Sequence, residues 1–112
     1  MGGEGGGDTK HLVLVKFKED TVVEDLMNDM GSLVSDLDIV KSFEWGEDVG
    51  SMEMLRQGFT HVFVLTFKNE QDFTAYSNHP KHVEFSGKFA ASIEKVLLFH
   101  FPAVSVKLPP SA

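Results

Sequence analysis

Ten residues, from Tyr76 to Phe85, bring a phenol, two imidazoles and a proline together in the sequence Tyr-Ser-Asn-His-Pro-Lys-His-Val-Glu-Phe. Pro80 suits the first turn of a helix, because its missing N–H would have no partner there in any case. His79 then stands just outside this predicted helix, and His82 stands in its first turn. The positive end of the helix dipole disfavours an imidazolium, and a neutral imidazole can accept a proton at neutral pH. The pattern therefore indicates a candidate general base.

The same side chains also have structural interpretations. His82 could be a buried imidazole that is hydrogen-bonded to the backbone or to Tyr76, because buried polar groups are normally paired. Tyr76 could be a core residue with its hydroxyl at the edge, and His61, in an apolar run, could be a satisfied core histidine. A zinc site of His79, His82 and Glu84 is disfavoured, because Glu84 is two residues from His82 and points away from it on a helix.

Length and composition limit the classes of protein to which the chain can belong. Its 112 residues leave room for one domain, and 42% apolar residues with ten phenylalanines are typical of a folded core. A formal charge of −7 argues against nucleic-acid and anionic-membrane partners, which attract basic surfaces. The absence of cysteine excludes disulfides and, with no recognisable targeting signal, fits the cytoplasm. No GxGxxG, P-loop or nucleophile elbow is present, so cofactor-free acid–base chemistry is the enzymatic option.

Short apolar runs predict four strands, which are residues 11–17, 39–45, 59–67 and 95–101. The polar connection 46–58 is long enough to be mobile or to contain one helical turn. The domain is expected to extend over residues 10–101, between a flexible Gly-rich leader, residues 1–9, and an extended tail, residues 102–112.

Three helices are expected between these strands. Thr21 can cap the first, in which apolar side chains recur every three or four positions. Asn69 can cap a short helix that continues to Tyr76, and Pro80 begins another helix that ends near Ala91. The resulting order, β-α-β-β-α-β, predicts an α+β, ferredoxin-like protomer whose helices all cover one face of an antiparallel sheet.

The other face of this sheet is also expected to be apolar. Its side chains, with no helix left to cover them, are Leu12, Leu14, Val62, Val64, Leu97, Phe99 and Phe101. An apolar patch of this size is normally buried against a partner. A homodimer in which the two sheets meet face to face, a dimeric α/β barrel, is therefore expected.

Four ordered motifs carry a resemblance to a known family: Lys10-His-Leu-Val13, Phe43-Glu-Trp-Gly-Glu-Asp48, Gln57-Gly-Phe-Thr-His61 and His79-Pro-x-His-Val-x-Phe85. Together they resemble the plant stress-responsive A/B barrel (Dabb) family from Lys10 to about Phe101. The resemblance implies a dimeric, typically heat-stable barrel. The family includes boiling-stable and antifungal proteins, and a polyketide cyclase that closes a linear tetraketide by aldol condensation.

The resemblance also implies a site. In the cyclase the acting residues are a tyrosine near the end of the short helix and the second histidine of His-Pro-x-His, which match Tyr76 and His82. Imidazole can deprotonate a methylene flanked by carbonyls, and a phenol can orient the reacting carbonyl oxygen. The expected pocket lining is His11, Val13, Val15, Leu26, Met27, Met30, His61, Phe63, Val96 and Leu98. Three features of the cyclase pocket differ here. Leu26, Met27 and Met30 replace aromatic residues on its first helix. Phe63 replaces a valine, and Ile93 replaces a tryptophan.

Some family members contain a magnesium-like ion bound by main-chain carbonyls after the first helix, which would correspond to Val34, Leu37 and Val40. No other cofactor is expected. Two functions remain open at this point. One is a homodimeric stress or defence protein that binds a small apolar ligand without changing it. The alternative is a cofactor-free, polyketide cyclase-like lyase that uses Tyr76 and His82 on a polyketide-like ligand.

Overall fold

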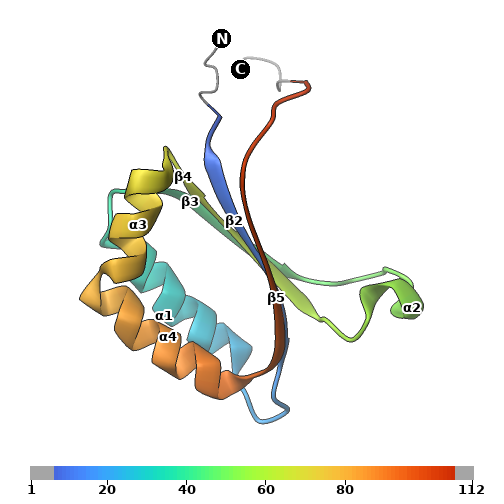
Figure 1. Cartoon of the computed structure of the whole chain (residues 1–112). Helices are drawn as coiled ribbons and strands as arrows, with labels where there is room; N and C mark the ends of the chain where they lie inside the picture. Colours follow the sequence, from blue (N-terminus) through green and yellow to red (C-terminus); the bar gives the residue numbers. More distant parts are fainter. Residues whose placement is uncertain (1–6, 108–112) are drawn as a thin grey trace.

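The computed structural model describes residues 7–107. Their elements are β2 (Thr9–Phe17), α1 (Val23–Ser35), β3 (Val40–Glu47), α2 (Glu53–Arg56), β4 (His61–Phe67), α3 (Glu70–Asn78), α4 (Pro80–Ser92) and β5 (Ile93–Pro102). The strands form one sheet in the order β3-β4-β2-β5, and each neighbouring pair is antiparallel. Figure 1 shows α1, α3 and α4 together on one face of this sheet. The predicted ferredoxin-like α+β fold is confirmed.

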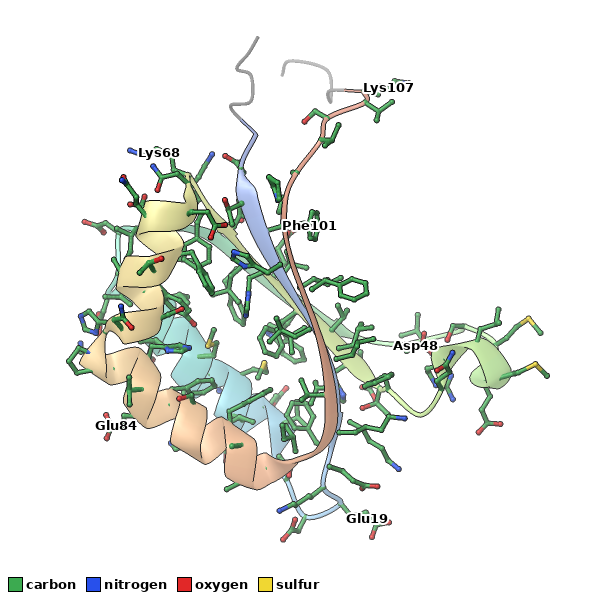
Figure 2. The ribbon with its side chains drawn as sticks, viewed as in Figure 1. Glu19, Asp48, Lys68, Glu84, Phe101 and Lys107 are labelled. Carbon is green, nitrogen blue, oxygen red and sulfur yellow. The ribbon has the colours of Figure 1, made fainter. Side chains whose placement is uncertain are left out.

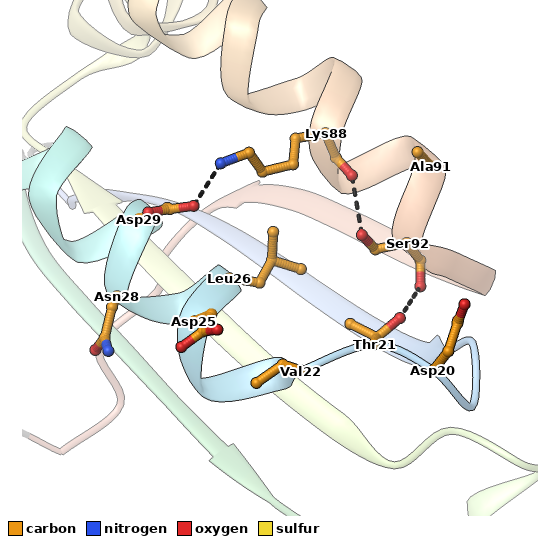
Figure 3. Close-up of a pocket in the computed structure, with 10 residues that line it drawn as sticks. All are labelled: Asp20, Thr21, Val22, Asp25, Leu26, Asn28, Asp29, Lys88, Ala91 and Ser92. Atoms are coloured by element: carbon orange, nitrogen blue, oxygen red, sulfur yellow. Dashed lines mark hydrogen bonds and ion pairs between the residues drawn. The ribbon is translucent and has the colours of Figure 1, made fainter.

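The expected elements are all present, with ends displaced by a few residues, and the polar connection contains the single turn α2. The prediction for Thr21 is wrong. The residue that precedes α1 is Val22, and no side chain caps the helix there. Thr21 instead donates its hydroxyl hydrogen to the carbonyl of Ser92, 3.1 Å away, and so connects the start of α1 to the end of α4 (Figure 3).

The predicted leader and tail lie partly outside the described residues, which exclude 1–6 and 108–112. Within the described part, β2 already begins at Thr9 and β5 ends at Pro102. The backbone N–H of Ala103 donates to the carbonyl of Asp8, so the two ends of the domain lie beside each other. Among residues 7–107, no helix has the length and apolar character needed to cross a bilayer.

The hydrophobic core lies between the sheet and the three larger helices. Alternate residues of β2 and β4 point toward the helices, as period-two patterning requires, while α1 contributes side chains at helical spacing. The buried side chains are Val13, Val15, Phe17, Leu26, Met27, Met30, Leu33, Leu37, Phe63, Leu65, Phe67 and Tyr76. Phe67 and Val15 have no exposed surface, so the centre of the core lies under the two middle strands.

The junction between α3 and α4 positions the residues of the stretch from Tyr76 to Phe85. Asn69 caps α3, because its side-chain oxygen accepts a hydrogen bond from the backbone N–H of Asp72 at 2.8 Å. The chain leaves helical geometry at His79 (φ −67°, ψ 135°), as expected for a residue that precedes proline. Nδ1 of His79 accepts from the N–H of Lys81 and so caps α4. Tyr76 and His82 therefore lie on either side of a sharp bend.

Removing the cap of α3 is expected to lower stability modestly. Asn69→Ala should reduce the free energy of unfolding by about 1 kcal/mol, because the N–H of Asp72 loses its partner. Urea unfolding measures this change. Asn28, which is exposed on α1, provides the matched control: Asn28→Ala should leave stability equal or slightly higher, because alanine favours a helix. Equal stabilities for the two variants would contradict the capping role.

The sheet face opposite the helices is apolar and uncovered in the protomer. Leu97, Phe99 and Phe101 of β5 are 42%, 58% and 40% exposed, and Figure 2 shows Phe101 on the side of β5 away from the helices. Leu12 and Leu14 of β2 and Val62 and Val64 of β4 lie beside them and are half-buried. We refer to these seven side chains as the open sheet face. Its apolar character agrees with the sequence-based expectation.

Candidate functional site

A cavity of about 350 Å³ lies between the inner face of the sheet and helices α3 and α4. Its lining is mostly apolar, with a few polar side chains. The lining residues are His11, Val13, Met30, Phe63, Leu65, Phe73, Tyr76, Ser77, His82, Phe85, Ser86, Phe89, Val96 and Leu98. Eight of the side chains predicted to form the site are thus brought together: His11, Val13, Met30, Phe63, Tyr76, His82, Val96 and Leu98.

Four other predicted pocket residues lie elsewhere. Val15 is fully buried in the core, and Met27 borders a hollow beside β3. His61 accepts or donates a hydrogen bond with the hydroxyl of Thr60 at 2.8 Å and stacks on Trp45, as expected for a satisfied histidine. Leu26 borders an open, polar hollow of about 670 Å³ between α1 and α4, drawn in Figure 3. The polar contacts in that hollow are ordinary surface hydrogen bonds and ion pairs, and the hollow lacks the apolar enclosure of a ligand site.

Tyr76 and His82 face each other across the helix bend. Their ring centroids are 4.5 Å apart. Nδ1 of His82 lies 3.0 Å from the carbonyl oxygen of Ser77, and a carbonyl can only accept, so this nitrogen carries the hydrogen. In the neutral ring, Nε2 is therefore an unprotonated base. The backbone hydrogen bond expected of a structural histidine and the tautomer required of a general base are thus present together.

Burial determines the protonation states of this pair. It lowers the pKa of His82, while the hydrogen bond to the Ser77 carbonyl opposes this shift. Burial also raises the pKa of the Tyr76 phenol. The hydroxyl of Tyr76 points to the sulfur of Met30 at 3.9 Å, a weak acceptor. At neutral pH the site therefore contains a neutral base next to a protonated phenol whose hydrogen can be donated to a ligand oxygen.

His11 is the third titratable residue of the lining. Burial, followed by the positive charges that His100 and His82 would carry, lowers its pKa from 6.5 to about 4. Its Nδ1 lies 3.2 Å from Nδ1 of His100 on the adjacent strand β5. His11 is consequently neutral at physiological pH.

These lowered pKa values predict acid sensitivity. Between pH 6.5 and about 4 the unfolded chain binds a proton at residue 11 that the folded protein does not bind, so falling pH favours unfolding. His11 is partly exposed to solvent, and we therefore expect a loss of about 1–2 kcal/mol over this window. Urea unfolding at successive pH values measures it, and His11→Gln should flatten the dependence. Parallel curves for the wild type and this variant would contradict the prediction.

The cavity remains open in spite of the large side chain of Phe63. That ring is 5% exposed and packs edge to face against Phe89 at 5.6 Å and Phe43 at 6.0 Å, so it forms part of the wall. The remaining volume of about 350 Å³ is near the lower end of the range of about 300–1,000 Å³ found for ligand sites. The cavity therefore suits a small ligand.

Several lining residues were not predicted. They are Leu65, Phe73, Ser77, Phe85, Ser86 and Phe89. Phe85 and Phe89 are four residues apart on α4, a spacing that places both on one helix face and would have identified them. His100 alternates with Val96 and Leu98 along β5, so a period-two analysis would have placed it on the inner face beside His11.

The main-chain ion site predicted at Val34, Leu37 and Val40 stays a prediction. The carbonyl of Val34 accepts from the N–H of Leu37, and the carbonyl of Leu37 accepts from the N–H of Val40, in two consecutive turns. A carbonyl oxygen has a second lone pair, and main-chain oxygens are ligands that hard cations accept. Residues 7–107 contain no cluster of three metal-binding side chains.

Comparison with known proteins agrees with the fold and the motifs. The Stress responsive A/B Barrel Domain family model matches residues 9–103. A stress-response A/B barrel domain-containing protein of Arabidopsis thaliana is 56% identical over 98 residues, which are 88% of each chain. Olivetolic acid cyclase of Cannabis sativa is 30% identical over 95 residues, with 82% of this chain and 93% of the cyclase covered.

Solved structures show the same architecture. A crystal structure of an Arabidopsis thaliana protein has a TM-score of 0.81 at 39% identity and covers 89% of this chain and 99% of that one. Two more distant proteins share the fold alone. They are a Passiflora edulis hydroxynitrile lyase (TM-score 0.80, 24% identity, 93% and 99% covered) and a protein of Thermobifida fusca described as dimeric and ferredoxin-like (0.73, 20%, 88% and 92%). The chain belongs to the stress-responsive A/B barrel domain family.

Proposed function

We propose that this protein is a homodimeric stress or defence protein that binds a small, mostly apolar ligand in the cavity beside Tyr76 and His82. One observation carries the proposal: within the described residues, Nε2 of His82 has no protein partner, and the Tyr76 hydroxyl has only a thioether. Tyr76 is buried and His82 is half-buried, and polar groups removed from water are normally paired, so a ligand that supplies the missing partners gains affinity. The cytoplasm is the proposed compartment and suits a cysteine-free chain.

The lining defines the chemistry of such a ligand. Apolar side chains from β2, β4, β5 and α4 surround most of the cavity and match an apolar body. Tyr76 can donate a hydrogen bond and His82 can accept one, so the polar end should carry both an oxygen acceptor and a hydroxyl or N–H donor. Small phenols satisfy these requirements and are suitable probes.

Filling the cavity tests the proposal. Ser86 borders it from α4, and Ser86→Met places a flexible apolar side chain in the space. Calorimetric titration with phenol should show binding to the wild type and a loss of at least about tenfold in the variant, because the volume is no longer available. Ser35→Met, at the end of α1 and outside the cavity, is the matched control and should bind like the wild type. Equal binding by wild type and Ser86→Met would contradict the proposal.

A cofactor-free lyase is the second candidate, favoured by the tautomer that the Ser77 carbonyl imposes on His82. Nε2 would remove a proton from a methylene flanked by two carbonyls, and the carbanion would attack a carbonyl of the same chain. The Tyr76 hydroxyl would stabilise the developing oxyanion, which finally takes the proton from His82.

An assay coupled to a type III polyketide synthase, with products identified by mass spectrometry, separates this activity from binding alone. Product profiles unchanged by the protein favour the non-catalytic role for the substrates tried.

The open sheet face supports the homodimer. Burial of seven apolar side chains of each protomer in one symmetric interface would remove a contiguous apolar patch of the kind that marks protein–protein contacts. The Thermobifida fusca relative, which shares the fold, is described as dimeric. Because this face is opposite the helices, the dimer leaves the cavity of each protomer accessible.

A further inference from the structure

Three side chains form a hydrogen-bonded row from the protein surface to the cavity. His100 on β5 lies directly opposite His11 on β2, and their Nδ1 atoms are 3.2 Å apart. Nε2 of His100 lies 2.7 Å from a carboxylate oxygen of Glu70, the first residue of α3. Only His11, at the inner end of the row, borders the cavity. We refer to these residues as the Glu70 row.

The hydrogen atoms of the row can be counted. An ionised carboxylate only accepts, so Nε2 of His100 must carry the hydrogen in its bond to Glu70. A neutral His100 then has a lone pair on Nδ1. Two facing Nδ1 atoms need one hydrogen between them, so Nδ1 of His11 donates it. Nε2 of His11 is left as an acceptor.

Packing keeps the two imidazoles in these positions. The ring of Phe73 on α3 lies 4.2 Å from the His100 ring and 5.0 Å from the His11 ring, measured between centroids. The His100 side chain is 26% exposed, while that of Glu70 is 62% exposed. The row therefore begins at a solvated carboxylate and ends at a half-buried imidazole that borders the cavity.

We propose that Glu70, acting through His100, holds His11 as its Nδ1–H tautomer, so that Nε2 of His11 is a fixed acceptor for a hydroxyl or N–H of the cavity ligand. Glu70 and His100 are positioning residues, and His11 is the residue that contacts the ligand. This role rests on the proposed function of the cavity. The tautomer itself is a property of the free protein and can be measured without any ligand.

Without Glu70, nothing fixes which of the two histidines donates the hydrogen between their Nδ1 atoms. Either ring can donate the hydrogen that they share, and His11 then presents either a lone pair or an N–H to the cavity. A ligand hydroxyl would meet a donor in part of the population. Glu70 thus favours ligands that donate a hydrogen bond to Nε2 of His11. His82 likewise favours ligands that donate one to its own Nε2.

Histidine ¹⁵N NMR at pH 7.5 tests the tautomer, because two-bond couplings distinguish Nδ1–H from Nε2–H. We expect Nδ1–H for His11 in the wild type. Glu70→Gln, whose carbonyl still accepts, should keep it, whereas Glu70→Leu and His100→Phe should give averaged or Nε2–H patterns. Glu84→Leu, an exposed carboxylate on α4, is the control and should match the wild type. An Nε2–H His11 in the wild type, or an unchanged pattern in both Glu70→Leu and His100→Phe, would overturn the proposal.

A pair of probes tests the acceptor role. Resorcinol has two hydroxyl donors, one for His82 and one for His11, whereas 3-methoxyphenol has a methyl ether in place of one of them. The wild type should bind resorcinol about threefold to tenfold more tightly than 3-methoxyphenol, and Glu70→Leu should reduce this preference. Equal affinities of the wild type for both probes, or a preference that Glu70→Leu leaves intact, would overturn the acceptor role. Failure of both probes to bind, with the Nδ1–H tautomer observed, would contradict the cavity function and not the positioning of His11.

Discussion

We expect Leu12→Glu to convert the proposed dimer to monomers. Leu12 lies at the middle of the open sheet face, between Val64 of β4 and Phe99 of β5. Face-to-face association would bury the carboxylate of each protomer among apolar side chains, and two unpaired buried charges cost several kcal/mol. We expect the dissociation constant to rise by at least about 10³. The protomer itself should still fold, because Leu12 is only half-buried in it and lies outside the core.

Light scattering after size-exclusion chromatography measures the mass of each form. Val83→Glu introduces the same charge on α4, where the side chain is 58% exposed and far from the open sheet face, and should remain dimeric. A dimeric Leu12→Glu protein with an unchanged melting temperature would show that the two sheets do not meet in this way.

His82→Asn should remove the basic atom of the site while keeping its structural hydrogen bond. The amide of asparagine occupies the place of Nδ1, from which it can donate to the Ser77 carbonyl, and no atom replaces Nε2. Any turnover in the coupled assay should fall by about 10²–10⁴, the usual contribution of a general base. Tyr76→Phe should also lower it, because the phenol no longer donates to the oxyanion.

His79→Asn is the matched control for this substitution. His79 caps α4 through Nδ1 and does not border the cavity, and asparagine is itself a good capping residue. Stability and turnover of this variant should therefore equal those of the wild type. Full turnover in His82→Asn would exclude His82 as the base, and the cavity would then be a binding site alone.

The fold could be predicted because its signals are local. Strand alternation, the Asn69 cap and the helix start at Pro80 are each visible within a few residues. Thr21 was misassigned because its partner, Ser92, is 71 residues away in the sequence. A hydroxyl next to a predicted helix normally caps it, and only the packing of α1 against α4 shows otherwise.

The sequence predicts the parts of the site whose residues are close together in the chain. It predicts fewer of the contacts between residues that are far apart in the chain. Tyr76 and His82 flank one bend, so their proximity follows from the helix break at Pro80. The family resemblance predicts Leu26, Met27 and Met30 of α1 at the pocket, but the rotation of α1 over the sheet brings Met30 alone of the three to the cavity. The pairing of Glu70 with His100 spans 30 residues and depends on how α3 lies over β5.

Titration of the protein with phenol, followed through its methyl signals by NMR, tests the central claim most directly. The account predicts saturable shifts at the methyl groups that line the cavity, Val13, Met30, Val96 and Leu98, and no shifts at Leu12 and Leu97 on the open sheet face. Shifts confined to the open sheet face, or no saturable shift at the cavity methyl groups, would contradict a ligand site beside Tyr76 and His82.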